Sequence, residues 1–368
     1  MSALAITSLT LSHFRSHKRS QLETDGRSVA IFGPNGAGKT NILEAISLLS
    51  PGRGLRRART EDLSRKPEAL GWKISAEISL KSELHAIETT FAGEGSRSVV
   101  IDDTVTAQVA LAEWVRIAWL VPAMDRLWTE GADGRRRFLD RITLSFFPNH
   151  GTATLAYEKA MRERNRMLKD GVRDPSWYGA VEKQMAQFGA MIESNRRLTL
   201  SRLAAAQTSA STAFPAAALD LVGPDNTEPI FEETELADAM SDSRPQDMAA
   251  GRSLIGPHRD DLLANYAEKS MPAKDCSTGE QKALLISLVL SNGRALAEDF
   301  GAAPILLLDE VAAHLDADRR AALYLELDQM GAQAWMTGTG AELFSSIGDD
   351  VLRLEVTEAK GVSTLRSG

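Results

Sequence analysis

Alternating apolar and polar residues in the first hundred positions predict a β-rich region. Leu4–Leu11 and Gly71–Leu80 alternate or are rich in β-branched residues, and Ser82–Phe91 and Arg97–Ile101 are separated by a glycine-containing turn. The short apolar segment Val29–Phe32 runs directly into a glycine-rich stretch. We therefore expect several strands here, one of which opens onto a tight turn.

The middle of the chain has helical periodicity instead. In Gly179–Ala206, apolar residues recur at spacings of four, three and four, as on one face of an amphipathic helix. Leu155–Lys169 is a second helical pattern, and the two are expected to pack as a pair. Thr208–Thr227 is rich in small residues and contains two prolines, so we predict a loop or connector there.

After Pro304 the pattern becomes strand, helix and strand. Ile305–Leu308 and Ala332–Met336 are apolar and short, and Ala317–Met330 between them has helical spacing. This alternation is typical of a parallel sheet covered by helices. A further apolar helix is expected at Ala283–Leu296.

Composition predicts a globular chain with enough residues for about two packing units, at roughly 150 residues per unit. Of the 368 residues, 43% are hydrophobic and 25% charged. The one cysteine, Cys276, excludes an intrachain disulfide and favours a reducing, cytoplasmic location. The longest apolar run, Ala283–Leu290, is too short to span a bilayer, so no membrane association is expected.

The net charge of −8 argues against a polyanionic partner, but the charges are unevenly distributed. Pro51–Lys66 carries six basic and two acidic residues, and Gly134–Arg173 carries ten and four. Asp225–Ala250 has eight acidic residues and one basic residue. Because charge acts locally, the two basic segments are able to meet nucleic-acid phosphates.

The segment Gly33–Thr40 fits the pattern G-x-x-x-x-G-K-[ST] and lies between a predicted strand and a predicted helix. Glycines allow backbone N–H groups to turn toward phosphates at a helix N-terminus. Lys39 would neutralise the β- and γ-phosphates, and the Thr40 hydroxyl would bind Mg²⁺. The predicted nucleotide-binding residues are Gly33, Asn35, Gly36, Ala37, Gly38, Lys39, Thr40 and Asn41.

A second acidic motif follows the buried-strand pattern of Pro304–Leu308. Asp309, at the end of that strand, is predicted to hold Mg²⁺ through water, and Glu310 to polarise the attacking water as the catalytic residue. Taken alone, the same residues would also suit an acidic helix cap. Lys39 and Asp309 are 270 positions apart, so a large insertion separates the two halves of the nucleotide fold.

The segment Cys276–Lys282 resembles the signature motif of the ABC-type ATPases, although Thr278 stands where that motif has a glycine. The resemblance implies that this segment binds the γ-phosphate of ATP held by a second subunit; taken alone, it would be a helix cap. Val311–Asp316 matches the family's D-loop, which lies across the dimer interface. The implied trans residues are Ser277, Thr278, Gly279, Glu280 and Asp316.

Two parts of the ABC pattern are missing. Trp119–Leu127, where the family's glutamine loop should fall, has no glutamine. The switch histidine should follow the strand at Ala332–Met336, but the chain has Thr337-Gly338-Thr339-Gly340 there. Thr337 and Thr339 are therefore candidate sensors of the γ-phosphate. The missing histidine weakens the alternative of a membrane transporter's ATPase subunit.

Over almost its whole length the chain resembles the RecF family of ABC-type ATPases. The SMC proteins share this ATPase head but interrupt it with long coiled coils, whereas only a short helical pair is predicted here. The motifs that carry the resemblance are Phe14-Arg15, Gly33–Asn41, Arg135–Arg141, Gly256–Asp261, Ser277–Gln281 and Leu306–Asp316.

The resemblance implies an α/β fold: an ABC-type P-loop ATPase head with mixed sheets around the nucleotide site, an inserted helical lobe and no long coiled coil. We expect the head to comprise residues 1–120 and 296–368, and the helical lobe, including the signature motif, to comprise 121–295.

The family resemblance also implies a function in recombinational repair and replication restart. Such a protein binds ATP and Mg²⁺, forms an ATP-dependent homodimer, and binds duplex DNA and single/double-strand junctions. Weak, dimer-dependent ATP hydrolysis then releases it. The resemblance further implies RecR, RecO and RecA as partners, with RecA loading at gapped DNA, and a nucleoid-associated, cytoplasmic location. A nucleotide switch that does not hydrolyse ATP remains an alternative.

The basic segments supply candidate DNA contacts, which would be largely independent of sequence and sensitive to salt. Each cluster has a simpler alternative, namely a solvated charged face, and Arg135–Arg141 would also suit packing between the lobes. The candidate DNA-binding residues are Arg56, Arg57, Arg135, Arg136, Arg162 and Arg166.

Overall fold

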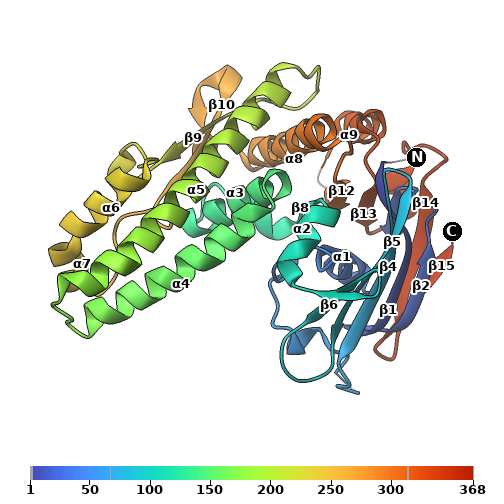
Figure 1. Ribbon diagram of the computed structural model, residues 1–368. Helices are drawn as coiled ribbons and strands as arrows, with labels where there is room; N and C mark the ends of the chain where they lie inside the picture. Colours follow the sequence, from blue (N-terminus) through green and yellow to red (C-terminus); the bar gives the residue numbers. More distant parts are fainter. Residues whose placement is uncertain (1–2, 67, 313–314, 368) are drawn as a thin grey trace. The chain divides into compact units, whose positions relative to one another are not determined.

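A computed structural model describes residues 3–66, 68–312 and 315–367 (Figure 1). The chain divides into two compact units. Unit 1 comprises Met1–Asp125, Ser209–Pro215 and Lys282–Gly368, and unit 2 comprises Arg126–Thr208 and Ala216–Gln281. Unit 2 is therefore an insertion between the N-terminal and C-terminal parts of unit 1.

A mixed sheet in unit 1 contains the strand that precedes the glycine-rich loop. It is formed by β3 (Val29–Phe32), β8 (Ile117–Leu120), β12 (Ile305–Leu308), β13 (Ala334–Gly338), β14 (Leu352–Ala359) and β15 (Val362–Ser367). Their order is β15-β14-β3-β13-β12-β8, and all neighbours are parallel except β14 and β15. The four residues of β12 are all buried, as expected for a central parallel strand covered on both faces.

An antiparallel sheet forms the other layer of strands in unit 1. Its order is β2-β1-β4-β5-β6-β7. The bounds are β1 Leu4–Phe14, β2 His17–Glu23, β4 Trp72–Leu80, β5 Glu83–Phe91, β6 Ser98–Ile101 and β7 Thr104–Thr106. Alternate residues of β4 are buried, which explains the alternation of its sequence. The predicted strands are confirmed, whereas β2, which lacks apolar alternation, was not anticipated.

The helices of unit 1 are α1 (Lys39–Ser47), α2 (Leu111–Trp114), most of α8 (Thr278–Phe300), and α9 (Ala317–Met330). Helix α8 begins in unit 2 and enters unit 1 at Lys282. Residues 283–290 are all buried. The compact units therefore divide at 281/282, inside the segment 121–295 that the sequence suggested as one lobe.

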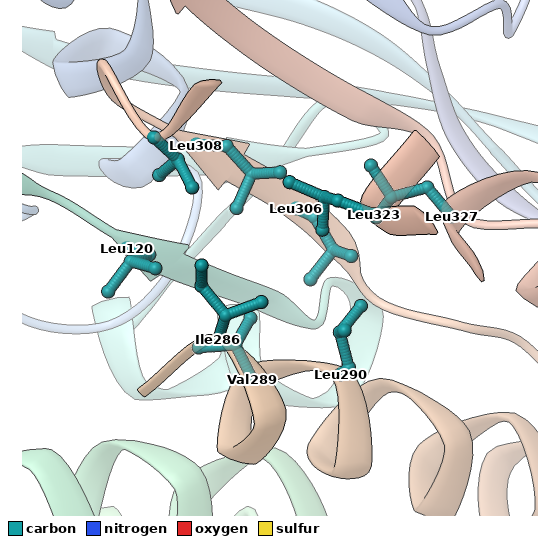
Figure 2. Close-up of a pocket in the computed structure, with 9 residues that line it drawn as sticks. Leu120, Ile286, Val289, Leu290, Leu306, Leu308, Leu323 and Leu327 are labelled. Atoms are coloured by element: carbon teal, nitrogen blue, oxygen red, sulfur yellow. The ribbon is translucent and has the colours of Figure 1, made fainter. Parts of the chain in front are cut away.

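Figure 2 shows the apolar packing between α8 and β12 within unit 1. Leu120 of β8, Ile286 and Leu290 of α8, and Leu306 and Leu308 of β12 line a void of about 10 Å³. The void is no larger than a water molecule requires, and its lining is apolar. It is a small packing defect of the core.

Unit 2 consists of helices and a small antiparallel sheet. The helices are α3 (Ala132–Phe146), α4 (Asn149–Lys169), α5 (Pro175–Thr208), α6 (Glu233–Asp242) and α7 (Arg244–Ala250). The strands β9 (Ala217–Val222), β10 (Asp261–Tyr266) and β11 (Met271–Pro272) pair in the order β11-β10-β9. The predicted helical pair α4–α5 is confirmed. The prediction of a loop over Thr208–Thr227 is wrong, because β9 pairs along its whole length with β10.

A buried ion network holds the helices of unit 2 together. The Arg164 side chain is fully buried and donates to Glu182 Oε1 at 3.0 Å and to Asp247 Oδ2 at 2.6 Å. It also donates to Ser253 Oγ and to the carbonyl oxygen of Met240. A buried guanidinium with this many acceptors is fully compensated, so the network is stable while it remains complete.

Among the described residues, no helix combines the length and apolar character needed to cross a membrane. Within the same residues the longest helix is α5, and no long coiled coil occurs. The expected α/β fold class without a long coiled coil is confirmed.

Arg164→Met is expected to destabilise the protein by about 3–5 kcal/mol, because it leaves Glu182 and Asp247 buried without a counter-charge. Chemical denaturation followed by circular dichroism measures the loss. The matched control is Arg162→Met on the same helix, where the side chain is 67% exposed, and a change below about 0.5 kcal/mol is expected. Equal losses for the two variants would contradict the assigned role of the network.

His258 gives unit 2 a pH dependence. Its Nε2 donates to the carbonyl oxygen of Ser253 at 3.0 Å, so Nδ1 accepts from the Tyr157 hydroxyl at 2.8 Å. Burial lowers the pKa of His258 to about 4, assisted by the charges of Arg259 and Arg136. Folding therefore favours the neutral ring, and this stability is complete above pH 6.5 and is lost as the pH falls toward 4.

His258→Gln is expected to lower the unfolding free energy at pH 7.5. The difference from wild type should shrink by roughly 1–3 kcal/mol between pH 6.5 and pH 4, because the glutamine has no proton to take up. Urea titrations at a series of pH values measure this difference. A difference independent of pH would show that the His258 ring is not held neutral by the fold.

Candidate functional site

The glycine-rich loop connects the end of β3 to the start of α1 in unit 1. Gly33 has φ 146° and lies against the carbonyl oxygen of Val356, which a Cβ would approach to 2.1 Å. Gly38, with φ 102°, is the N-cap residue of α1. Both positions require glycine, because an L side chain is strained at these φ values and no space exists for one. The loop thus has the backbone form that a phosphate site needs.

Lys39 is buried within the loop that it follows. Its Nζ donates to the carbonyl oxygens of Gly33 at 2.7 Å and Pro34 at 2.9 Å. Burial lowers the pKa of Lys39, and the charges of Glu310 and Asp309 oppose that shift. The ammonium group is therefore placed at the loop and near two carboxylates, as a phosphate-neutralising cation requires.

The Asp309 carboxylate joins three segments of unit 1. Its Oδ1 accepts hydrogen bonds from Thr40 Oγ1 at 2.9 Å and from Thr337 Oγ1 at 2.7 Å. Thr40 and Asp309 are 269 positions apart in the sequence. Pairing of β12 with β8 and β13 fixes the carboxylate, since the Asp309 N–H donates to the carbonyl oxygen of Leu120. The two predicted Mg²⁺ ligands are thus brought together.

Glu310 follows in a left-handed backbone conformation, with φ 55°. Its N–H donates to Thr337 Oγ1 at 2.9 Å. Thr337 therefore contacts both members of the acidic pair, and the other candidate sensor, Thr339, is exposed. Thirteen other described non-glycine residues also have a positive φ, so this conformation alone assigns Glu310 no role.

The donor set at Asp309 fits Mg²⁺. The Thr40 hydroxyl and the Asp309 carboxylate supply hard oxygen ligands at hydrogen-bond distance from each other. Mg²⁺ is commonly held by one or two such protein groups together with water and substrate phosphates. When bound, the ion would offset the negative charge of the phosphates.

A buried carboxylate that the sequence did not single out lies one turn into α1. Glu44 accepts two hydrogen bonds from Arg15, at 2.8 and 2.9 Å, and one from Arg56 at 3.3 Å. Arg56 also donates to Asn41 Oδ1 at 2.9 Å. Arg15 and Arg56 are therefore anchored beside the helix that follows the loop.

The signature segment belongs to unit 2 as far as Gln281, and it caps α8. The N–H and the hydroxyl of Ser277 both donate to Glu280 Oε2, at 2.8 and 2.7 Å. Hydrogen bonds from Lys269 and Ser277 lower the pKa of Glu280 to about 2. This is a capping box, and Thr278 and Gly279 are exposed at its start. A role toward ATP in a second subunit stays a prediction for these residues.

The D-loop is described in part, since Ala313 and His314 lie outside the described residues. Asp316 is the N-cap of α9, and its side chain accepts from the Arg319 N–H at 2.8 Å. In the expected position of the glutamine loop, Pro122–Arg126 forms a 3₁₀ turn. Asp125 of that turn lies 3.5 Å from Lys282.

The two family-specific blocks of unit 2 contact each other. Arg135 forms a bidentate pair with Asp261, at 2.7 and 2.8 Å, and Arg136 donates to the carbonyl oxygen of Asp260. Arg196 joins Asp140 to the carbonyl oxygen of Pro257. The guanidinium groups of Arg135 and Arg136 thus form hydrogen bonds inside unit 2. A DNA-contacting role for them stays a prediction.

The other candidate DNA contacts are more accessible. Arg57 and Arg166 are exposed, and the Arg56 side chain is 43% exposed. Arg162, on α4, is exposed and pairs with Glu158 at 3.5 Å. Arg57, Arg162 and Arg166 can meet a phosphate backbone without dismantling a buried network, whereas Arg56 would have to leave Glu44 and Asn41.

Sequence reasoning missed three polar residues that lie against the glycine-rich loop. They are Ser16, His17 and Ser363, and a Cβ on Gly38 would lie within 3.2 Å of a side-chain atom of each. No motif distinguishes them. Their part in the site follows from their contacts, since Ser363 is 326 positions from its partner Ala37.

Comparison with known proteins places the chain in a family. The family model described as the RecF/RecN/SMC N terminal domain matches residues 5–363. A DNA replication and repair protein RecF from Mesorhizobium japonicum is 47% identical over 354 residues, covering 93% of each chain. The corresponding protein from Rhizobium leguminosarum bv. trifolii is 44% identical over 367 residues, covering 97% of this chain and 98% of the relative.

Solved structures show the same fold. A structure of the recombination mediator protein RecF with ATP aligns with a TM-score of 0.85 at 22% identity, covering 99% of this chain and 98% of that one. An Smc head domain from Pyrococcus furiosus aligns with a TM-score of 0.57 at 17% identity, covering 99% and 96%. These relatives do not favour a transporter ATPase. The chain belongs to the RecF family of DNA replication and repair proteins.

Proposed function

We propose that the chain is a DNA-binding ATPase that dimerises when it binds ATP and Mg²⁺. The observation that supports this most directly is the meeting of Thr40 and Asp309 beside the buried Lys39. These residues come from the N-terminal and C-terminal parts of unit 1. Together they supply a hydroxyl, a carboxylate and a cation in one place. This is the donor set that binding of a Mg²⁺–nucleotide requires.

In the proposed reaction the residues of unit 1 bind and orient the triphosphate. Lys39 exchanges its carbonyl partners for phosphate oxygens, while N–H groups of the loop donate to the phosphates. The Thr337 hydroxyl donates to Asp309 and keeps its carboxylate oriented. Glu310 accepts a hydrogen bond from the attacking water and acts as a general base toward it.

Dimerisation would complete the site. We propose that Ser277, Thr278, Gly279 and Glu280 of a second copy approach the γ-phosphate, and that Asp316 lies at the interface. The exposed start of α8 supports this, because helix N-termini favour anions. Ser277 would exchange its hydrogen bond with Glu280 for one to the phosphate. Hydrolysis is therefore expected to be weak in the monomer and to depend on the dimer.

DNA binding is proposed for the ATP-bound dimer, at duplexes and single/double-strand junctions. Arg56, Arg57, Arg162 and Arg166 would contact phosphates, and Arg135 and Arg136 would contribute if their internal pairs opened. Partnership with RecR, RecO and RecA, and a nucleoid-associated cytoplasmic location, complete the proposal. They rest on membership of the family.

Glu310→Gln is expected to trap an ATP-bound dimer, because the variant binds ATP but cannot polarise the attacking water. Size-exclusion chromatography with light scattering, with and without ATP and Mg²⁺, measures the dimer fraction. Wild type should return to monomer as ATP is consumed, and Glu310→Gln should not.

Lys39→Met is the companion variant and should lose both ATP binding and dimerisation, since the loop then lacks its cation. A Glu310→Gln protein that stays monomeric with ATP would refute the ATP-dependent dimer. Persistence of the dimer in wild type without ATP consumption would instead favour a nucleotide switch that does not hydrolyse ATP.

Arg162→Gln/Arg166→Gln is expected to weaken ATP-dependent binding to a gapped duplex about tenfold at moderate salt. The slope of log affinity against log salt should fall by about two. Fluorescence anisotropy across a salt series measures both quantities. The control Lys18→Gln/Lys73→Gln changes the net charge equally at exposed positions of the antiparallel sheet. An equal loss in both double variants would show that total charge, and not α4, determines DNA binding.

A further inference from the structure

The C-terminal β-hairpin reaches the glycine-rich loop. β14 pairs with β3 up to Glu355 opposite Phe32, which is the last residue before the loop. A two-residue turn at Lys360 and Gly361, both with positive φ, then reverses the chain into β15. Ser363 is thereby buried, and its N–H donates to the carbonyl oxygen of Ser16 at 2.9 Å.

Consecutive hydrogen bonds connect Asn41 of α1 to Ser16, Ser16 to Ser363 of the hairpin, and Ser363 to the loop. Arg56 can only donate, so its bond to Asn41 Oδ1 turns Asn41 Nδ2 toward Ser16 Oγ, at 2.8 Å. Ser16 Oγ lies 2.6 Å from Ser363 Oγ, and Ser363 Oγ lies 2.6 Å from the carbonyl oxygen of Ala37. The Ser363 hydroxyl is the donor in both contacts, and its single proton lies between the Ala37 carbonyl and the Ser16 hydroxyl.

His17 makes the next contact along the loop. Its Nε2 lies 3.2 Å from the carbonyl oxygen of Gly38 and must donate to it. Nδ1 of the neutral ring then accepts from Ser20 Oγ at 2.9 Å. The His17 ring is fully buried, so both ring nitrogens have defined roles.

These contacts orient two peptide groups. In a trans peptide the C=O and the following N–H point in opposite directions. With the Ala37 carbonyl held by Ser363, the Gly38 N–H points away from the hairpin. The Gly38 carbonyl accepts from His17 and from the Asn41 N–H, so the Lys39 N–H points away from His17. These two N–H groups stand at the N-terminus of α1, where the proposed site would bind a phosphate.

We propose that Ser363 is a positioning residue for nucleotide binding: the C-terminal hairpin fixes the Gly38 and Lys39 amides toward the phosphates of the ligand. Ser16 and His17 support the same two peptide groups. The proposal rests on the proposed ATP site. It adds to that site the C-terminal hairpin, which lies far from the loop in the sequence. It assigns Ser363 no contact with the nucleotide itself.

Ser363→Ala tests the proposal in the full-length protein. Without the hydroxyl the Ala37 carbonyl loses its donor, and the Gly38 amide is free to turn. ADP with Mg²⁺ is the probe, because it carries phosphates and is not hydrolysed. Titration calorimetry should show its Kd raised roughly tenfold, the size expected for one lost hydrogen bond to a buried group. Urea denaturation should show a folded protein.

Steady-state kinetics provide a second measurement. They distinguish a positioning role of Ser363 from a purely structural one. The loop amides contact phosphates before and during the reaction, so Ser363→Ala should raise KM for ATP about tenfold. The kcat at saturating ATP should stay within about twofold. A loss of kcat in proportion to the loss of folded protein, with KM unchanged, would overturn the proposal.

Thr364→Val is the matched control on the adjacent residue. The Thr364 hydroxyl bonds Thr357 Oγ1 at 2.9 Å on the exposed face of the same hairpin. Its removal should leave the Kd of ADP within about twofold of wild type. If Thr364→Val weakens ADP as much as Ser363→Ala does, the effect comes from the hairpin in general and the proposal fails.

Ser16→Ala and the double variant Ser16→Ala/Ser363→Ala test whether the two serines act as one chain. Ser16→Ala should weaken ADP about threefold, and the double variant should be no weaker than about Ser363→Ala alone. Effects that multiply would refute the chain. Ser16→Ala also serves if Ser363→Ala fails to fold, since an unchanged Kd there contradicts the proposal. If wild type itself does not bind ADP or ATP, the proposed function fails first.

Discussion

The site depends on one carboxylate that holds two hydroxyl groups. Asp309 Oδ1 accepts from Thr40 and from Thr337; Asp309 follows β12, Thr40 lies in α1 and Thr337 lies near the end of β13. Parallel strands place their C-terminal ends at one edge of a sheet, so the groups meet there by construction. Loss of this contact would release the Thr40 and Thr337 hydroxyls, while strand pairing still holds β3 and β12 on either side of β13.

Unit 2 shows a different use of charge. Arg164 and Arg196 are buried and each has carboxylate partners, so the helical unit is held by ionic contacts as well as by apolar ones. Such networks are costly to break and tolerate few substitutions. The basic residues nearest in sequence, Arg162 and Arg166, are exposed. In the basic segment Gly134–Arg173, some arginines therefore hold unit 2 together and others are available to contact phosphates.

Local sequence patterns predicted the fold where neighbouring residues determine it. Val29–Phe32, Ile305–Leu308 and Ala317–Met330 were predicted at their observed bounds, because short apolar strands and an amphipathic helix leave a clear period. β9 was mistaken for a loop, because small residues and flanking prolines conceal a strand that is formed by its pairing with β10. β2 was missed for the same reason, since its polar sequence is stabilised by β1.

The sequence by itself determined the form of the phosphate loop, the acidic pair and the cap at Ser277, because each is a contiguous motif with its own backbone geometry. The tertiary structure decided which distant groups meet: Thr40 with Asp309, Arg135 with Asp261, and Ser363 with Ala37. Contacts across hundreds of residues leave no period in the chain. They depend on strand order and register, which are fixed only when the sheets assemble.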